Sequence, residues 1–295
     1  MKTVLSTQVK LHLIILLLGL TGIVGAIVTL DSVIVVWYRM VFAIIGLYLY
    51  FLYKRESLKV DKDNLLKIMG TGVLVSLHWI FFFESIKVSN VSVALACFAS
   101  TSLFASILEP IFYKRKIIAY EIAFGICVII GLYLIFKFES AYAKGIFFAL
   151  LSALLDVLFV IFNGKLIKKN NAKIITFYEL IGGIIFTSIY LIFTQKINAS
   201  FFTMSFLDFN CLLFLGIICT SFAFVVTTDI MREVSPYTIA ISFNLEPIYS
   251  ILFALLFFGK NEFMSLGFYI GTVVILSTVF ANSYFKAKKK PNVAT

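Results

Sequence analysis

Ten apolar segments, each of about the length needed to cross a bilayer, occupy nearly all of this chain. A transmembrane helix takes roughly 17–25 predominantly apolar residues. The segments that meet this requirement are Leu11–Leu30, Val33–Tyr53, Leu65–Ile86, Ser89–Tyr113, Ala119–Phe136, Gly145–Phe162, Ile174–Phe193, Phe209–Ile230, Pro236–Phe258 and Met264–Tyr284. The connections between them are too short for a soluble domain. The chain is therefore predicted to be an all-α integral membrane protein with ten transmembrane helices.

The positive charge of the chain follows its predicted topology. The formal net charge is +10, which alone would fit binding to a nucleic acid. If the N-terminus is cytoplasmic, however, most of the 25 Lys and Arg residues fall in or beside the cytoplasmic connections, as the positive-inside rule requires. Both termini are therefore predicted to be cytoplasmic. The lipid bilayer is the expected surrounding, and no nucleic-acid partner is expected.

The two halves of the chain carry a weak internal repeat. A shift of 146 residues places Gly70 on Gly216, Ala94 on Ala240, Gly125 on Gly271 and Ile129 on Ile275, and a shift of 140 places Trp37-Tyr38-Arg39 on Phe177-Tyr178-Glu179. Because each half holds an odd number of helices, the second copy is inverted relative to the first. Residues 1–140 and 141–295 are thus predicted to form two inverted five-helix repeats, with the solute site near the membrane midplane where they meet. The first segment also has features of a signal peptide, but its spanning length and its place in the repeat favour a retained helix.

Three short motifs, taken in their order along the chain, carry a family resemblance. The W-x-R of the second segment (Trp37, Arg39), the sequence ESIKVSNVSVA after the third and LEPIYSILFALLFFGK in the ninth are similar to the EamA type of the drug/metabolite transporter (DMT) superfamily. The resemblance covers almost the whole chain. It implies a multi-pass transporter of the inner (cytoplasmic) membrane that moves small organic metabolites by alternating access, often as an exporter of amino acids. The chain departs from the family pattern in that Thr101 stands where the fourth helix would match the proline of the ninth.

A carboxylate in the middle of the ninth segment is the strongest site candidate. Glu246 lies about 15 Å into the apolar run that begins at Pro236, half of the roughly 30 Å hydrocarbon layer. An ionisable group at this depth normally faces a bundle interior or a watery cavity. Glu246, with Asn244 nearby, is predicted to take up a proton or to bind a solute amine, and Pro247 is predicted to kink the helix beside it. The alternative is a carboxylate that neighbouring hydroxyls satisfy and that only holds the kink.

Further polar residues at a similar depth are candidates for solute binding or coupling. Ser100, which the repeat matches to the ninth-helix carboxylate, and Thr101 offer hydroxyls, although such hydroxyls often bond their own helix backbone. Asp156 is a second midplane carboxylate, for which a structural ion pair is the alternative. His78 and Trp79 are candidates for proton uptake and for stacking on a solute. A lone histidine is, however, more often a satisfied interior group.

Two residues of opposite charge occupy equivalent places in the inverted repeat. Arg39 is predicted to act as a gate or to clamp a carboxylate of the solute, because a guanidinium offers bidentate geometry. The alternative is that its long side chain reaches the membrane interface. Glu179, its counterpart, falls near the cytoplasmic side and is a candidate gate.

The functional hypothesis rests on the absence of enzyme motifs as well as on the membrane pattern. The sequence has no HExxH, GxSxG, P-loop or GxGxxG motif and no recognisable metal-binding spacing. We therefore expect no cofactor, no metal and no enzymatic activity. The hypothesis is a secondary transporter that exports a small, amino-acid-like solute, with or without coupling to protons. The alternatives are a cationic drug or multidrug exporter and a non-transporting membrane scaffold or intramembrane enzyme.

Overall fold

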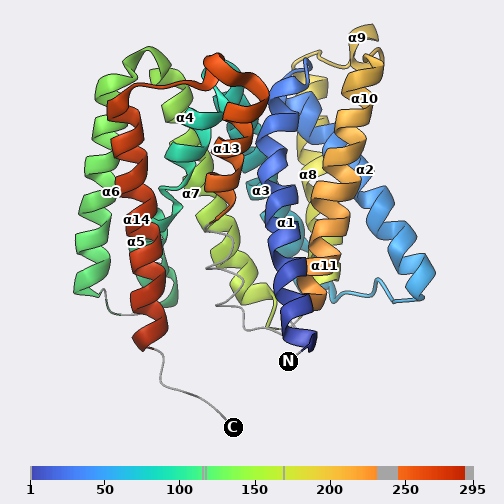
Figure 1. Cartoon of the computed structure of the whole chain (residues 1–295). Coiled ribbons are helices and arrows are strands. Elements are labelled where there is room, and N and C mark those ends of the chain that lie inside the picture. The colour runs from blue at the N-terminus through green and yellow to red at the C-terminus, as the bar shows by residue number, and fades with distance from the viewer. Residues whose placement is uncertain (1, 115, 117, 169, 231–244, 290–295) are drawn as a thin grey trace.

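The computed structural model of this chain describes residues 2–114, 116, 118–168, 170–230 and 245–289, and every regular element within them is helical (Figure 1). The α-helices are α1 (Lys2–Ile27), α2 (Ser32–Lys54), α3 (Lys62–Val88), α4 (Val91–Phe98), α5 (Thr101–Tyr113), α6 (Ala119–Phe138), α7 (Ala143–Leu166), α8 (Ala172–Phe193), α9 (Ala199–Phe202), α10 (Phe206–Leu213), α11 (Ala223–Ile230), α13 (Glu246–Phe258) and α14 (Leu266–Lys289). The segment η2 (Phe214–Phe222) is π-helical, and η1 (Ser140–Tyr142) and η3 (Gly259–Glu262) are 3₁₀ turns. Helix α1 begins and α14 ends at the same end of the bundle, which we call the terminal end; the opposite end is the distal end (Figure 1).

Eight helical spans of the described chain are long and apolar enough to cross a membrane. They are Val9–Ile27, Ser32–Lys54, Lys62–Val88, Val91–Tyr113, Ala119–Phe138, Ser140–Leu166, Ala172–Phe193 and Phe206–Thr227, and Leu266–Asn282 is a shorter apolar helix. These nine helices coincide with nine of the predicted segments. The other predicted segment, Pro236–Phe258, is described only from residue 245 onward, where α13 supplies its second part.

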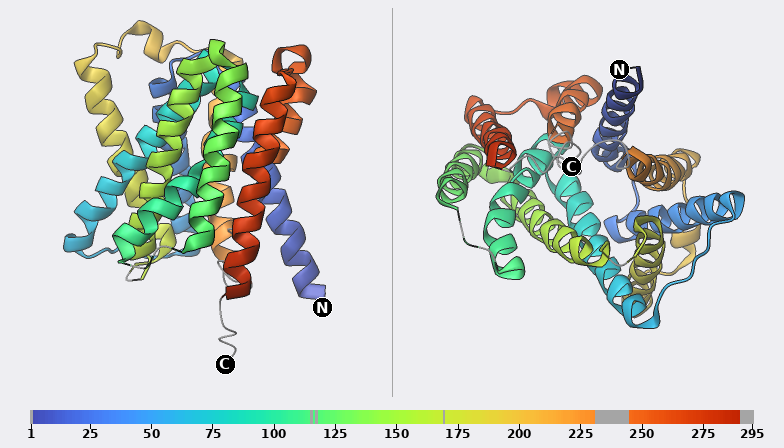
Figure 2. Two further views of the ribbon diagram at one scale, coloured as in Figure 1. Left: turned by 90° about the vertical axis from the view of Figure 1, so that its left-hand side faces the viewer. Right: turned by 90° about the horizontal axis from the view of Figure 1, so that it is seen from below.

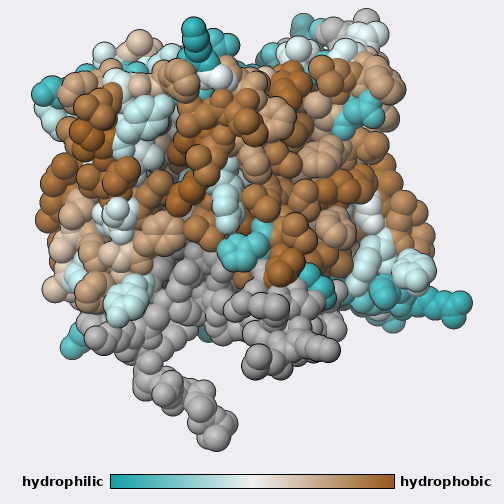
Figure 3. All heavy atoms as spheres, viewed as in Figure 1, coloured by the Kyte–Doolittle hydropathy of each residue, from teal (hydrophilic) through white to brown (hydrophobic). Residues whose placement is uncertain are grey.

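Large apolar side chains face outward around the middle of the bundle. On α6, for example, Ile122, Ile126, Ile129 and Tyr133 are all at least half exposed. Figure 3 shows a mostly brown, apolar band across the middle of one face, with hydrophilic residues more frequent towards the two ends. Such a belt matches contact with lipid tails, because an aqueous surface of this size would not be apolar. The structure is that of a multi-pass membrane protein.

Two predicted helices are interrupted near mid-span, which their apolar pattern did not indicate. The fourth segment divides at Ala99–Ser100 into α4 and α5. In the eighth, the π-helical η2 is accompanied by hydroxyls that engage backbone carbonyls. Thr220 Oγ1 donates to Leu215 O, five residues earlier (2.8 Å), and Ser221 Oγ donates to Ala43 O on α2 (2.6 Å) while lying 3.2 Å from Gly216 O. Hydroxyls that compete for backbone carbonyls favour such irregularities. Breaks and π-helical turns inside helices frequently mark functional sites.

Glycines allow several helix pairs to pack at backbone distance. A Cβ at Gly72 on α3 would overlap the carbonyl oxygen of Glu179 on α8. Helices α6 and α14 pack together at one edge of the bundle (Figure 2), and there a Cβ at Gly131 would lie 2.8 Å from the carbonyl oxygen of Gly271. Small residues let transmembrane helices approach closely where no hydrophobic effect drives them together. Close backbone contact therefore holds α3 against α8 and α6 against α14.

Two apolar cores combine early and late parts of the chain. The larger core includes Met40, Leu47, Phe83, Leu180 and Leu215. The second includes Val93, Val128, Ala149, Phe268 and Ile275. Because each core draws on helices from both parts of the chain, neither part can complete its packing without the other.

Buried carboxylates join the two parts of the chain at the distal end. Glu262, in η3, is 3% exposed and accepts hydrogen bonds from the backbone N–H groups of Val91 (3.0 Å) and Ser92 (2.8 Å), at the start of α4. Asp208, in α10, accepts hydrogen bonds from the N–H (2.9 Å) and the hydroxyl (2.8 Å) of Thr29. A carboxylate at a helix N-terminus satisfies orphan donors and complements the helix dipole. These bonds tie helix ends from the two parts of the chain together at the distal end of the bundle.

Replacing Glu262 by Gln is expected to destabilise the protein by roughly 1–3 kcal/mol, because the amide can accept at one atom only and leaves a buried N–H without a partner. The change is measured as a lowered thermal unfolding temperature in detergent. Lys260→Gln, in the same 3₁₀ turn but exposed, is the control and should leave that temperature unchanged. Equal unfolding temperatures for Glu262→Gln and the unaltered protein would show that this contact does not stabilise α4.

Candidate functional site

A cavity of about 640 Å³ lies among the helices. Helices α1, α2, α3, α4, α5, α7, α8, α11, α13 and α14 and the π-helical η2 all contribute to its wall. Most of the wall is apolar, and its polar or charged members are Thr21, Arg39, His78, Thr101, Asp156, Asn163, Thr176, Glu179, Thr220, Thr227 and Glu246. Pockets for small organic ligands have this size and this mixture of apolar wall and few polar groups.

The cavity gathers most of the residues predicted from the sequence. Arg39, His78, Trp79, Thr101, Asp156, Glu179, Glu246 and Pro247 all line it. Ser100 is completely buried beside Thr101 instead, and its hydroxyl has no hydrogen-bond partner among the described residues. Asn244 lies outside the described residues. Residues scattered over six predicted segments thus meet around one space.

Arg39, on α2, is held in place from two sides. Its side chain is buried, its Nε donates to Thr220 Oγ1 at 2.9 Å, and its guanidinium carbon lies 4.1 Å from the centre of the Trp79 ring. A guanidinium over an indole is a favourable cation–π pair. The Nη1 atom is buried and has no hydrogen-bond partner in the described part of the chain. A fixed cation with an unused donor therefore stands in the cavity wall.

Two carboxylates bring negative charge to the same cavity. Glu246 is the first residue of α13, and Asp156 lies midway along α7. Glu246 is near enough to interact electrostatically with both Asp156 and Arg39. Neither carboxylate forms an ion pair with another described residue. The pair can therefore bind a cationic group or take up a proton, because two neighbouring carboxylates resist ionising together.

The start of α13 places Pro247 in its first turn. A proline there loses no helical hydrogen bond, because the first N–H groups of a helix have no partner within it. The preceding residues 231–244 lie outside the described chain, so the kink at Pro247 stays a prediction. The start of α13 at Glu246 resembles the start of α5 in the first half of the chain, which comes directly after Ser100. Ser100 and Glu246, matched by the repeat, thus stand at equivalent helix starts.

Glu179, on α8, is held in the same manner as Arg39. Its side chain is 2% exposed, and its Oε1 accepts a hydrogen bond of 2.7 Å from Thr71 Oγ1 on α3. The backbone correspondence is also close: the carbonyl oxygen of Glu179 packs on Gly72, and that of Arg39 packs on Gly216. Each charge is therefore supported by a threonine hydroxyl and by close contact with a glycine of the facing helix.

His78, on α3, has one ring nitrogen engaged by the protein. Its Nδ1 lies 2.9 Å from Ser152 Oγ and 3.1 Å from Ser152 O, and its ring packs on Phe98 with 5.4 Å between the ring centres. These contacts orient the imidazole at the cavity wall. They also give Nδ1 the hydrogen-bond partner that an interior histidine needs. At this nitrogen, His78 is therefore a satisfied interior group, which was the alternative to a functional role.

Sequence reasoning missed five polar residues of the wall. Thr21 lies on α1, and Thr220 positions Arg39. Asn163, Thr176 and Thr227 line the part of the cavity near the terminal end, where α7 and α11 end and α8 begins. The Oδ1 atom of Asn163 is buried without a partner among the described residues. The threonines interrupt apolar segments, and Asn163 directly follows one, which was the available signal. The cavity therefore extends from Arg39 towards the terminal end.

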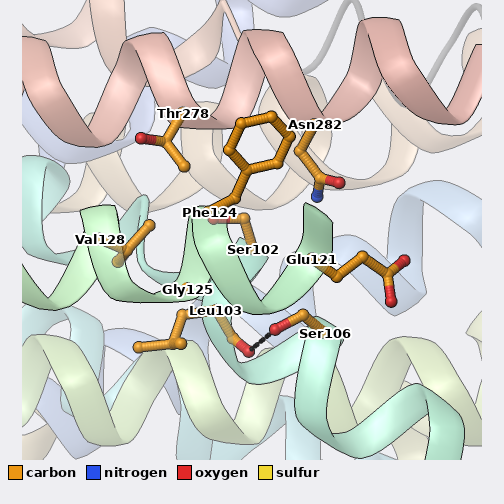
Figure 4. Close-up of a pocket in the computed structure, with 9 residues that line it drawn as sticks. All are labelled: Ser102, Leu103, Ser106, Glu121, Phe124, Gly125, Val128, Thr278 and Asn282. Atoms are coloured by element: carbon orange, nitrogen blue, oxygen red, sulfur yellow. Dashed lines mark hydrogen bonds between the residues drawn. The ribbon is translucent and has the colours of Figure 1, made fainter. Parts of the chain in front are cut away.

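A second polar region lies between α5, α6 and α14 (Figure 4). Ser102, Ser106, Glu121, Thr278 and Asn282 surround it, and Ser106 Oγ donates to Leu103 O at 2.7 Å. The space between them does not admit a water molecule. It is a packed helix contact rather than a second solute site. Nowhere among the described residues do His, Cys, Asp and Glu form a cluster suited to a metal ion.

Comparisons with known proteins agree with this architecture. The model of the EamA-like transporter family matches residues 9–137 and again residues 143–284. "Uncharacterized transporter YxxF" of Bacillus subtilis (strain 168) is 24% identical over 249 residues, which are 82% of this chain and 76% of that protein. A solved structure described only as "Crystal structure of protein" has a TM-score of 0.65 at 14% identity and covers 97% of this chain and 99% of its own. At that identity the likeness concerns the fold alone.

Proposed function

From the premise that this chain belongs to the EamA-like transporter family, we propose that it is a secondary transporter that carries a small organic solute through the 640 Å³ cavity by alternating access. Family membership indicates a membrane transporter rather than an enzyme. The observation that carries the proposal is the meeting of Arg39, Asp156 and Glu246 at this cavity, since ionisable groups within a membrane normally mark a solute or ion pathway. The inner (cytoplasmic) membrane is the proposed location.

Two inverted five-helix repeats, residues 1–140 and 141–295, are the proposed framework for this movement, with ten spans and both termini in the cytoplasm. The family model matches the chain twice, once in each half. The helix contacts support the same symmetry, because α3 packs on α7 and α8 while its repeat partner, formed by η2 and α11, packs on α1 and α2. Rocking of such halves about a central site is the usual means of alternating access.

The described state is the one proposed to open towards the terminal end. At the distal end the bonds of Glu262 and Asp208 tie helix ends together, whereas the cavity continues to Asn163 and Thr227 near the terminal end. With the termini in the cytoplasm, this is a state open to the cytoplasm. Export is the proposed direction, as the resemblance to the family implies.

An amino-acid-like solute is the proposed cargo, and coupling to protons is proposed to pass through Glu246 and Asp156. The cavity offers a cation in Arg39, carboxylates for an ammonium group, and apolar walls for a side chain. A cationic drug or multidrug exporter is the second candidate. It is favoured by the excess of carboxylates, since Asp156, Glu179 and Glu246 outnumber the one arginine of the wall.

Flux through reconstituted vesicles tests the proposal. The purified protein, placed in vesicles, is expected to speed the exit of at least one member of a panel of amino acids and organic cations, and a pH gradient is expected to change the rate. Vesicles without protein are the control. If no member of the panel moves under any gradient, the chain is not a transporter of such solutes and a scaffold role gains support.

A further inference from the structure

Two contacts hold the Arg39 side chain in a fixed position, which a charge that only neutralised the carboxylates of the cavity would not need. Its Nε is bonded to Thr220 Oγ1, and the face of its guanidinium lies on Trp79. With both the ring face and the Nε engaged, the side chain cannot reorient without losing two contacts. The Nη1 donors remain, and this atom is buried with no partner in the described chain.

An unpaired guanidinium donor is costly inside a membrane. Burying a charged or polar group without a hydrogen bond carries a large penalty. No carboxylate among the described residues lies within ion-pair distance of Arg39, although Glu246 interacts with it electrostatically. The site is therefore complete only when another group supplies an acceptor. Because Arg39 lines the cavity, that group can come from the solute.

We propose that the transported solute carries a carboxylate that binds the free Nη1 side of Arg39 while its apolar body lies along the aromatic wall that begins at Trp79. Planar carboxylates match guanidinium geometry and form charge-assisted hydrogen bonds with it. Phe82 and Phe98 continue this wall beyond Trp79. The inference rests on the proposed transport function. It narrows the cargo to solutes with a carboxylate and excludes those that are only cationic.

Thr220 is assigned a positioning role in this recognition. Its hydroxyl accepts from Arg39 Nε and donates to Leu215 O within the π-helical η2. With its proton committed to Leu215, the oxygen presents only a lone pair to the guanidinium. The π-helical turn thereby fixes the direction in which Arg39 offers its free donors.

Trp79 gives a direct readout of binding. The chain contains 2 Trp residues, and the other, Trp37, bonds Ser188 through its Nε1 at 2.8 Å and is not part of the cavity wall. In a Trp37→Phe protein, the fluorescence of Trp79 therefore reports on the space beside Arg39. The probes are leucine, phenylalanine and valine, each as the free amino acid, as the N-acetyl acid and as the amide. For each side chain, the carboxylate and the ammonium group are thus tested separately.

For at least one of the three side chains, the free amino acid and the N-acetyl acid are expected to change the Trp79 fluorescence saturably. The amides are expected to have no effect. Arg39→Gln should weaken carboxylate binding roughly tenfold or more, because a charge-assisted bond is lost. Thr220→Val should weaken the same probes several-fold, and Thr220→Ser, which keeps the hydroxyl, should restore them. A merely structural role of Thr220 would instead lower the unfolding temperature without changing the preference for acids over amides.

Equal binding of acids and amides, or full carboxylate binding by Arg39→Gln, would overturn the inference. The vesicle flux assay separates this failure from failure of the transport proposal. If organic cations without a carboxylate are moved and Arg39→Gln moves them equally well, the protein transports but Arg39 does not select the cargo. If the acids bind yet nothing is moved, the site is correct and the transport function is not.

Discussion

Vesicles containing Glu246→Gln are expected to lose pH-driven solute flux, by roughly tenfold or more if the carboxylate is the coupling group. Glutamine keeps the size of the side chain and its capacity for hydrogen bonds but can neither carry a negative charge nor take up a proton. Glu246 opens α13 at the cavity and interacts electrostatically with Asp156. Loss of its charge therefore removes half of the carboxylate pair that we propose to couple solute movement to protons.

Two comparisons make this result specific. Glu109→Gln, on α5, is the matched control, because Glu109 is not part of the cavity wall. Solute exchange at equal pH on both sides should survive in Glu246→Gln better than pH-driven flux, since exchange needs binding without net proton movement. Unchanged pH-driven flux in Glu246→Gln, or an equal loss in Glu109→Gln, would contradict a coupling role for Glu246. A double variant with Asp156→Asn should show less than the product of the two single losses, because the carboxylates interact.

Alanine at Gly72 is expected to destabilise the bundle, whereas alanine at Gly70, on the same helix, is expected to be tolerated. A Cβ at Gly72 overlaps the carbonyl oxygen of Glu179, which is backbone and cannot rotate away. A Cβ at Gly70 meets nothing within 4 Å. Overpacking of this kind costs typically about 1–3 kcal/mol. Alanine favours a helix over glycine by about 1 kcal/mol, so Gly70→Ala should leave stability equal or higher.

Thermal unfolding in detergent measures the difference between these two variants. Gly72→Ala should unfold at a lower temperature than the unaltered protein, and a larger residue, as in Gly72→Val, should lower it further. Flux should fall in parallel, because separation of α3 from α8 also displaces Glu179 from Thr71. Equal stability of Gly70→Ala and Gly72→Ala would mean that α3 and α8 do not approach as closely as the structure shows.

Much of the fold was predictable because membrane helices can be recognised in the sequence by their length and apolarity. An unbroken apolar run has only one way to satisfy its backbone in lipid, which is to form a helix. The predicted spans Ala119–Phe136 and Ile174–Phe193 accordingly end within two residues of α6 and α8. The break at Ala99–Ser100 and the π-helical η2 were not predictable in this way. Serine and threonine are compatible with a continuous helix, and only their packing decides whether their hydroxyls divert its hydrogen bonds.

The candidate site was predictable in its charged members but not in its geometry. Depth in an apolar segment was enough to single out Glu246 and Asp156, and Arg39 stood out as a charge within such a segment, because charge is costly in lipid wherever the chain places it. Their partners follow no such rule. Thr220 is an ordinary residue of its segment, and only the crossing of α2 over η2 places its hydroxyl 2.9 Å from Arg39 Nε.

The sequence by itself determined that this chain is a helical membrane protein, where most of its long apolar helices lie, and which charges fall within apolar segments. These are properties of single segments, governed by the transfer of side chains and backbone into lipid. The tertiary structure alone decided that one cavity gathers those charges and that Arg39 lies on Trp79 with a donor left unused. It also decided that Glu262 joins η3 to the start of α4 at the distal end. Such features depend on which helices cross and at which turn, and that is set by close contacts between residues far apart in the chain, such as Gly72 with Glu179.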